Sequence, residues 1–147
     1  MNEFKKTYHH VSIYLFNKTL YVVASVELPP VFVWAHVNPV EKVQNFSKEK
    51  IARAIDSTRE ISKSHFDPAH ANPEIKPWDG EKNQVWNHAT KLWSLWWKED
   101  ESVDIDTQNP DKMYRGDMQW KTVSKKTFPP PVSSQDIAQE ILTQAQP

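Results

Sequence analysis

Cysteine is missing from the 147-residue sequence. Its absence excludes disulfide bonds, cysteine-ligated zinc, iron–sulfur clusters and a cysteine nucleophile. Glycine is almost as scarce, because Gly80 and Gly116 are the only two. Phosphate-binding loops and dinucleotide fingerprints need clustered glycines where the backbone approaches a phosphate. The sequence therefore excludes both of these motifs.

Long apolar runs are also missing, and none approaches the roughly 18 residues that span a membrane. The first ten residues, MNEFKKTYHH, are polar and do not resemble a signal peptide. The net charge is −1 and no basic block occurs, which argues against general binding of nucleic acid. We therefore expect a cytoplasmic, single-domain protein over residues 1–147, long enough to bury a full core.

Strand-forming residues dominate the first third of the chain. Three β-branched and aromatic runs predict strands at Val11–Phe16, Thr19–Glu27 and Val31–Val37. Asn17 is the residue best able to adopt a positive φ in the short link between the first two. Asn38-Pro39 is expected to end the third strand. Together these segments predict a three-stranded antiparallel meander.

Helical spacing follows the strands. Apolar residues recur on one face over residues 48–64, and Ser47 is placed to cap the first turn. A wide apolar stripe predicts a second helix over residues 81–99. A short third helix is expected over residues 134–144, where Ser133 and Asp136 are spaced like a capping box.

Later strands complete the expected fold. Residues 102–107 alternate between apolar and acidic side chains and predict an edge or half-exposed strand, and residues 117–124 are a further candidate. Asn109-Pro110-Asp111 is expected to form a turn. The fold class is therefore α+β, with an antiparallel sheet packed against two main helices and a short C-terminal helix. Residues 125–147, which include three consecutive prolines, are a candidate flexible segment.

Tryptophan and carboxylate are unevenly distributed. Five of the seven tryptophans lie between Trp78 and Trp97, and six carboxylates with no Lys or Arg lie between Glu99 and Asp111. Tryptophan is enriched in interface hot spots, and a run of one charge sign creates a field for a basic partner. We expect Trp93 and Trp96 in the core. The pattern as a whole favours a binding protein.

Catalytic patterns are weak by comparison. His65, Asp67 and His70 could form a weak metal site or serve a small metal-dependent hydrolase, but their spacing matches no motif with a known mechanism. Asp104 and Asp106 point to one face of a strand, as paired acid–base carboxylates would. Trp78 and its neighbours could stack sugars in a carbohydrate-binding module. These remain alternatives, and we predict no catalytic residue, metal or cofactor.

A resemblance adds to this interpretation. The segments VSIYLFNKTLYVVASVE and PVFVWAHVNP, then KEKIARAIDSTREISKSHFDP and KLWSLWWKEDESVDI, resemble the immunity proteins of bacterial contact-dependent growth inhibition systems. The similarity lies in apolar spacing and a few aromatic positions over the first two thirds of the chain. The sequence departs from the family pattern at Asp67-Pro68, where His-Pro is expected, and in its acidic and proline-rich segments.

The resemblance implies a non-catalytic cytoplasmic protein that binds and blocks the C-terminal toxin domain of a large exoprotein. Such toxins are commonly nucleases, and the expected assembly is a 1:1 heterodimer without direct contact to nucleic acid or membrane. Mimicry of a nucleic-acid backbone would suit an acidic surface. The expected toxin-binding residues are therefore the acidic segment and one apolar anchor: Trp97, Glu99, Asp100, Glu101, Asp104 and Asp106.

Overall fold

The computed structural model describes residues 9–28, 33–64 and 81–145. Within them the elements follow the order β1 (His9–Phe16), β2 (Thr19–Leu28), β3 (Val33–Val43), α1 (Lys48–Ser64), α2 (Lys82–His88), β4 (Lys91–Trp97), β5 (Val103–Tyr114), β6 (Asp117–Phe128) and α3 (Ser134–Ala145). The strands form one six-stranded sheet in the order β3-β2-β1-β4-β5-β6, and every neighbouring pair is antiparallel. The predicted α+β class and the N-terminal meander are confirmed.

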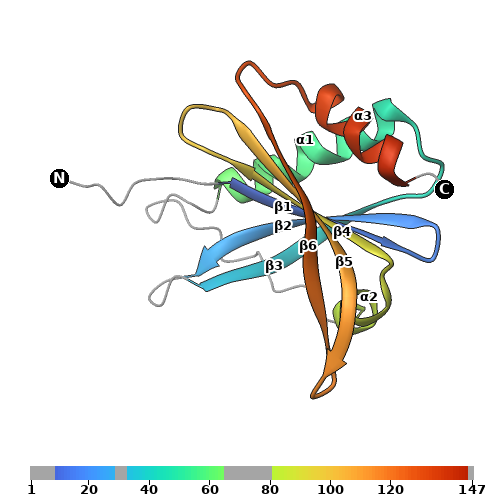
Figure 1. Ribbon diagram of the computed structural model, residues 1–147. Helices are drawn as coiled ribbons and strands as arrows, with labels where there is room; N and C mark the ends of the chain where they lie inside the picture. Colours follow the sequence, from blue (N-terminus) through green and yellow to red (C-terminus); the bar gives the residue numbers. More distant parts are fainter. Residues whose placement is uncertain (1–8, 29–32, 65–80, 146–147) are drawn as a thin grey trace.

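Helices cover the two faces of the sheet unequally (Figure 1). α1 packs against α3 and against β1, β2 and β3, and these contacts form the main core. Its members alternate along the strands and include Val11, Ile13, Leu20, Val22, Trp93, Leu95, Val103 and Ile105, with Ile51, Ile55, Ile137 and Ile141 from the helices. α2 lies on the opposite face, where a smaller cluster surrounds Tyr14, Tyr21, Val85 and Leu92. The second face is therefore the less completely covered one.

The turn between β1 and β2 has the geometry expected of a two-residue hairpin. Asn17 and Lys18 adopt φ values of 53° and 61°, as both central residues of a type I′ turn must. The prediction that Asn17 takes a positive φ is confirmed. Lys18 adopts the same conformation, although its side chain gives it no comparable preference.

The expected second helix over residues 81–99 is confirmed only as far as His88, and the remainder of the prediction is wrong. α2 ends at His88, Ala89 is extended with ψ 151°, and the chain continues as β4. β4 pairs with β1 on one side and β5 on the other and contributes side chains to both faces. A strand buried on both faces shows no clean alternation of apolar and polar residues. Its tryptophan-rich run therefore also matched a helical stripe.

Two expected breaks lie inside strands. β3 continues past Asn38-Pro39, and its register with β2 shifts between the pairings to Val22 and Ala24. β5 continues past Pro110, and its register with β6 shifts between Pro110 and Lys112. β3 is an edge strand, and at Pro110 β5 has β6 as its one remaining neighbour, since β4 pairs no further than Gln108. Proline is tolerated at edges and bulges because no ladder hydrogen bond is lost there.

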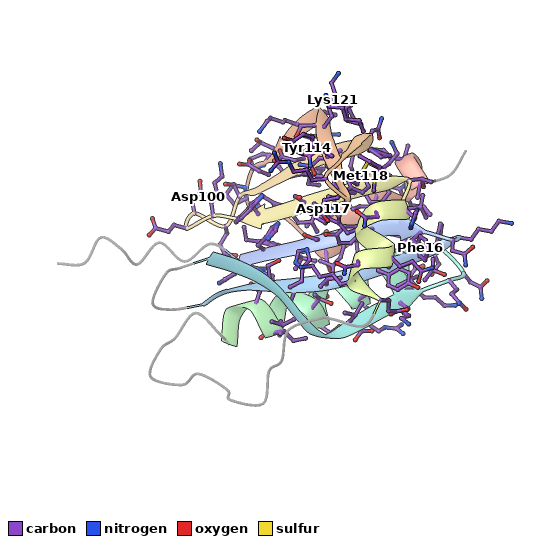
Figure 2. The ribbon with its side chains drawn as sticks, turned by 90° about the horizontal axis from the view of Figure 1, so that it is seen from below. Phe16, Asp100, Tyr114, Asp117, Met118 and Lys121 are labelled. Atoms are coloured by element: carbon purple, nitrogen blue, oxygen red, sulfur yellow. The ribbon has the colours of Figure 1, made fainter. Side chains whose placement is uncertain are left out.

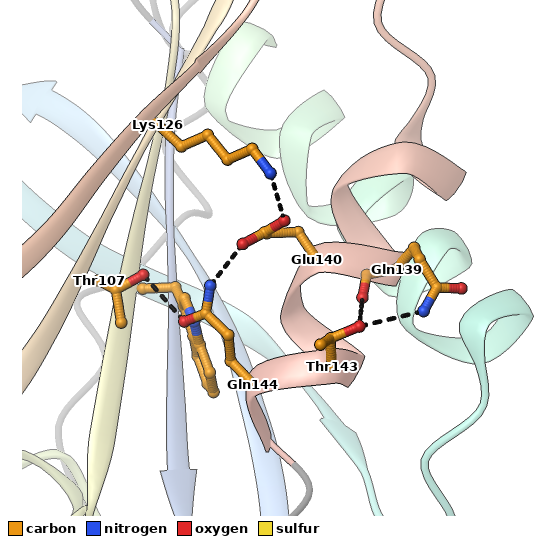
Figure 3. A network of polar contacts seen from close by, with 7 residues as sticks. Thr107, Lys126, Gln139, Glu140, Thr143 and Gln144 are labelled. Atoms are coloured by element: carbon orange, nitrogen blue, oxygen red, sulfur yellow. Dashed lines mark hydrogen bonds and ion pairs between the residues drawn. The ribbon is translucent and has the colours of Figure 1, made fainter.

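α3 is joined to the sheet by a polar network (Figure 3). Gln144 accepts hydrogen bonds from the Thr107 hydroxyl at 3.1 Å and the Trp93 indole at 3.0 Å. Lys126 of β6 forms a 2.9 Å ion pair with Glu140, and this contact lowers the pKa of the Glu140 carboxyl. The predicted capping box is present, because Ser133 and Asp136 bond each other's backbone N–H groups. Residues 125–128 belong to β6.

No helix in residues 9–28, 33–64 or 81–145 is long and apolar enough to cross a membrane.

Candidate functional site

Trp97 is not the exposed anchor that the acidic-surface interpretation needs. Its side chain is 3% exposed and belongs to the main core. The Arg59 guanidinium lies over its ring, 4.7 Å from the centroid. The strand pattern explains the error, because Trp97 shares the helix-covered face with Trp93 and Leu95. Trp93 is in the core as expected, whereas Trp96 lies on the opposite face.

Glu99, Asp100 and Glu101 form the exposed turn between β4 and β5. The Asp100 carboxylate accepts hydrogen bonds from the backbone N–H and hydroxyl of Ser102, and these bonds lower its pKa. Glu101 adopts a φ of 70° and forms a 3.0 Å ion pair with Arg59. We call these three residues the acidic turn. Two of its carboxylates already have partners in the same chain.

Asp104 and Asp106 lie on the half-exposed face of β5, as one of the two predicted alternatives states, but β5 is not an edge strand. β5 is flanked by β4 and β6. Asp104 lies 3.3 Å from Lys98 and accepts a hydrogen bond from Thr127, and Asp106 lies 3.6 Å from Lys125. The positive charges near these two carboxylates therefore come from Lys98, which directly precedes the acidic run in sequence, and from Lys125 of β6. These two carboxylates are partly exposed and partly neutralised.

A protruding two-stranded ribbon is the most exposed structured part of the described chain. Beyond Gln108, β5 pairs with β6 alone, and we call residues 109–123 the ribbon. Among the described residues, the exposed large hydrophobic side chains are Met113, Tyr114 and Val123, each at least half exposed. All three lie on the ribbon. Figure 1 shows its tip extending away from the body of the sheet.

α2 braces the ribbon. The Asn87 side chain donates to the Gly116 carbonyl at 3.3 Å and accepts from the Met118 N–H at 2.8 Å. The Trp86 indole donates to the Met118 carbonyl at 3.1 Å. Figure 2 looks onto this face, with Asp117 and Met118 beside α2 and Asp100 at the far end of the sheet. The ribbon and the acidic turn are therefore separate surfaces.

A row of polar side chains crosses the second face of the sheet. His36, Ser25 and His10 are cross-strand neighbours on β3, β2 and β1. The His36 ring lies 2.8 Å from the Ser25 hydroxyl through Nδ1 and 2.8 Å from the Tyr14 hydroxyl through Nε2. Burial, and secondarily the charge of Lys82, lower the pKa of His36 to about 4. Burial also raises the pKa of Tyr14.

His10 continues this row toward β4. Its ring stacks on Trp96 with centroids 3.8 Å apart and planes inclined by 13°. Burial, with a smaller contribution from His36, lowers the pKa of His10 to about 3. Both imidazoles are therefore neutral at physiological pH. They act as polar, uncharged walls of the space beneath α2.

Two adjoining cavities lie between α2 and the sheet. The inner one, about 340 Å³, has His10, Tyr14 and His36 among its lining residues. The outer one, about 620 Å³, reaches Trp120 on the ribbon. Lys82, Trp86 and Gln108 line both cavities. We call the two cavities together the groove. Its lining residues are His10, Ser12, Tyr14, His36, Lys82, Asn83, Trp86, Leu92, Ser94, Gln108, Asp117, Met118, Gln119 and Trp120. Clefts of this size with a few polar groups are common ligand sites.

The alternative sites are only partly described. His65, Asp67, His70 and Trp78 lie outside the described residues. Within the described ranges, no three His, Asp or Glu side chains gather into a group that could hold a metal ion.

The groove was missed in the sequence, although a signal for it exists. His10, Ser12 and Tyr14 alternate with the apolar residues Val11 and Ile13 in β1. This period of two predicts a strand with one apolar face and one face that carries polar side chains. The contribution of His36 could not be predicted in the same way, because it depends on the register between β2 and β3.

The chain matches no protein-family model, and neither a curated protein nor a solved structure shows significant similarity to it.

Proposed function

We propose that this protein is a non-catalytic immunity protein that binds the toxin domain of a contact-dependent growth inhibition exoprotein and blocks its active site. The toxin is proposed to be a nuclease. The ribbon, rather than Trp97, is the proposed apolar contact, and the acidic turn contributes charge. The complex contains one copy of each protein.

The ribbon is the observation that carries the proposal. Exposed large side chains gathered on one protruding element are typical of a protein-binding surface. Met113 and Tyr114 lie next to the tip, and Asn87 holds the backbone at the tip in place. A surface that is ordered before binding loses less conformational entropy on association. The ribbon therefore suits a stable complex better than the partly neutralised carboxylates do.

The acidic turn supports a second role. Glu99 and Asp100 are exposed, and no ion pair with a basic side chain is present for either in the described chain. Exposed charges mostly accelerate association, whereas buried apolar anchors slow dissociation. The first half of β5, residues 103–108, separates the turn from the ribbon. An interface of standard size, about 800 Å² per partner, would include one of these surfaces fully and the other partly or not at all.

Co-expression with the cognate toxin domain that the proposal requires tests the proposal. Stable co-purification and rescue of growth are expected from the unchanged chain. Tyr114→Ser should weaken the complex by at least about 2 kcal/mol, the usual effect at a hot spot, mainly through faster dissociation. Glu99→Lys should instead slow association, and this effect should shrink as salt is added.

Lys18→Ala is the matched control, because Lys18 is exposed in the β1–β2 turn, away from both surfaces. It should bind as the unchanged protein does. Failure of the unchanged chain to co-purify or to rescue growth would overturn the immunity function. Rescue that persists unchanged in Tyr114→Ser would instead reject the ribbon as the contact surface.

A further inference from the structure

The groove beneath α2 has features that a surface for toxin binding does not require. Its inner part is lined by buried polar groups that hydrogen-bond to one another, as His36 does with Ser25 and Tyr14. Its outer part lies against α2 and the ribbon. Several unrelated strands thus direct polar and aromatic side chains into one space. Such convergence in a cleft is a general indication of a ligand site.

The positive charge in the groove comes from one lysine. Lys82, at the start of α2, lines both cavities, and no carboxylate pairs with it among the described residues. The neighbouring carboxylate of α2, Glu81, is instead 2.9 Å from Lys42. Because His10 and His36 are neutral, Lys82 provides the positive charge of the inner cavity. An anionic group beside it would gain a charge-assisted hydrogen bond.

Aromatic rings form the walls where the two cavities meet. Tyr14, Trp86 and Trp120 contact one another with ring centroids 6.2 to 6.4 Å apart. The indole N–H of Trp120 is buried and has no acceptor among the described residues. A buried donor without a partner is unfavourable unless water or a ligand accepts from it. The aromatic walls thus favour a flat apolar body.

Asp117 limits the charge of the occupant. It lines the outer cavity together with Lys82, so an occupant with several negative charges would be repelled there. We propose that the groove binds a small planar monoanion, such as an aromatic carboxylate, with its charged group beside Lys82 and its ring against Trp86 and Trp120. This site shares Asp117, Met118, Gln119 and Trp120 with the ribbon, but binding of the monoanion does not require the toxin.

Titration with 2-naphthoate tests the proposal, and its neutral amide serves as the comparison ligand. Saturable 1:1 binding with a dissociation constant below about 1 mM is expected from calorimetry. The indole N–H resonance of Trp120, assigned with Trp120→Phe, should shift on binding. The neutral amide should bind at least about tenfold more weakly, because it lacks the charge-assisted contact.

Lys82→Gln should weaken naphthoate binding by at least about tenfold while leaving the far-UV spectrum unchanged. Lys112→Gln is the matched control, because Lys112 is exposed on the ribbon and does not line the groove. Non-saturable binding, equal binding of the amide, or full affinity in Lys82→Gln would each overturn the proposal. None of these outcomes depends on the toxin.

Discussion

The indole nitrogen of Trp93 donates a 3.0 Å hydrogen bond to the side-chain oxygen of Gln144, although 51 residues separate the two. Trp93 is fully buried in a central strand, and Gln144 lies in the last turn of the C-terminal helix. The same oxygen accepts the Thr107 hydroxyl. One amide thus satisfies polar groups of two buried residues of the sheet.

Gln144→Leu should destabilise the protein by about 1–3 kcal/mol, because it leaves the Trp93 and Thr107 donors buried without an acceptor. Urea unfolding followed by tryptophan fluorescence would measure the loss. Gln139→Leu is the matched control on the same helix, since Gln139 is exposed and its side-chain amide hydrogen-bonds to Thr143. Equal stability of the two variants would contradict the role assigned to Gln144.

Acid should destabilise the fold through His10 and His36. Their pKa values, about 3 and about 4 when folded, lie below the ordinary 6.5, so the unfolded chain binds more protons below that pH. Their contribution to stability is complete above pH 6.5. It is lost as the pH falls toward 4, at up to about 1.4 kcal/mol per pH unit for each histidine.

His10→Phe tests this pH dependence, because phenylalanine can keep the stack on Trp96 without a titrating group. The free energy of unfolding, measured between pH 7 and pH 4.5, should fall less steeply in this variant. His88→Gln changes an exposed histidine of α2 and should keep the steep fall. A slope unchanged by His10→Phe would argue against a neutral, buried His10.

Lys18→Gly should stabilise the β1–β2 hairpin. Lys18 adopts a φ of 61°, which glycine reaches without steric strain, and Asn-Gly is the favoured pair in a type I′ turn. The expected net gain is about 0.5–1 kcal/mol, because relief of about 1–2 kcal/mol of left-handed strain exceeds the entropy cost of glycine, and it is read from thermal or denaturant unfolding. Lys121→Gly, within β6, is the comparison and should lower stability instead.

Asn87→Ala should loosen the tip of the ribbon, because it removes the contacts to Gly116 and Met118. Hydrogen exchange at the Met118 amide is expected to accelerate while amides of β1 and β4 stay protected. Asn83→Ala, one turn earlier on the same helix and exposed, is the control. If toxin binding weakens in Asn87→Ala but not in Asn83→Ala, the brace contributes to recognition.

Local signals in the sequence predicted much of the fold. The hairpin at Asn17, the amphipathic α1 and the capping box at Ser133 each depend on a few adjacent residues, and all are confirmed. β4 was assigned to a helix because its place between two other strands, which decides its pattern, is a property of the whole sheet. The prolines at positions 39 and 110 were misread for the same reason.

The candidate site was less predictable than the fold. The acidic run is continuous in sequence, but the charges that offset it come from Arg59, Lys98 and Lys125. Only the pairing of β5 with β6 brings the last of these close. Likewise, the Ser25–His36 contact needs the register of two strands to be known. The sequence gives the residue types. Which charges pair and which polar side chains come together depends on the register of the strands.

The strand order also bears on how the molecule is divided. β1 to β3 form one half of the sheet and β4 to β6 the other, and the two halves meet along the seam between β1 and β4, from His9 opposite Trp97 to Leu15 opposite Lys91. Each half consists of strands adjacent in sequence, so its pairings close short loops. Pairing along the seam closes a much longer loop and joins the two halves of the sheet. We therefore expect two separately made pieces of the chain, divided between α1 and α2, to meet at this seam and restore the sheet.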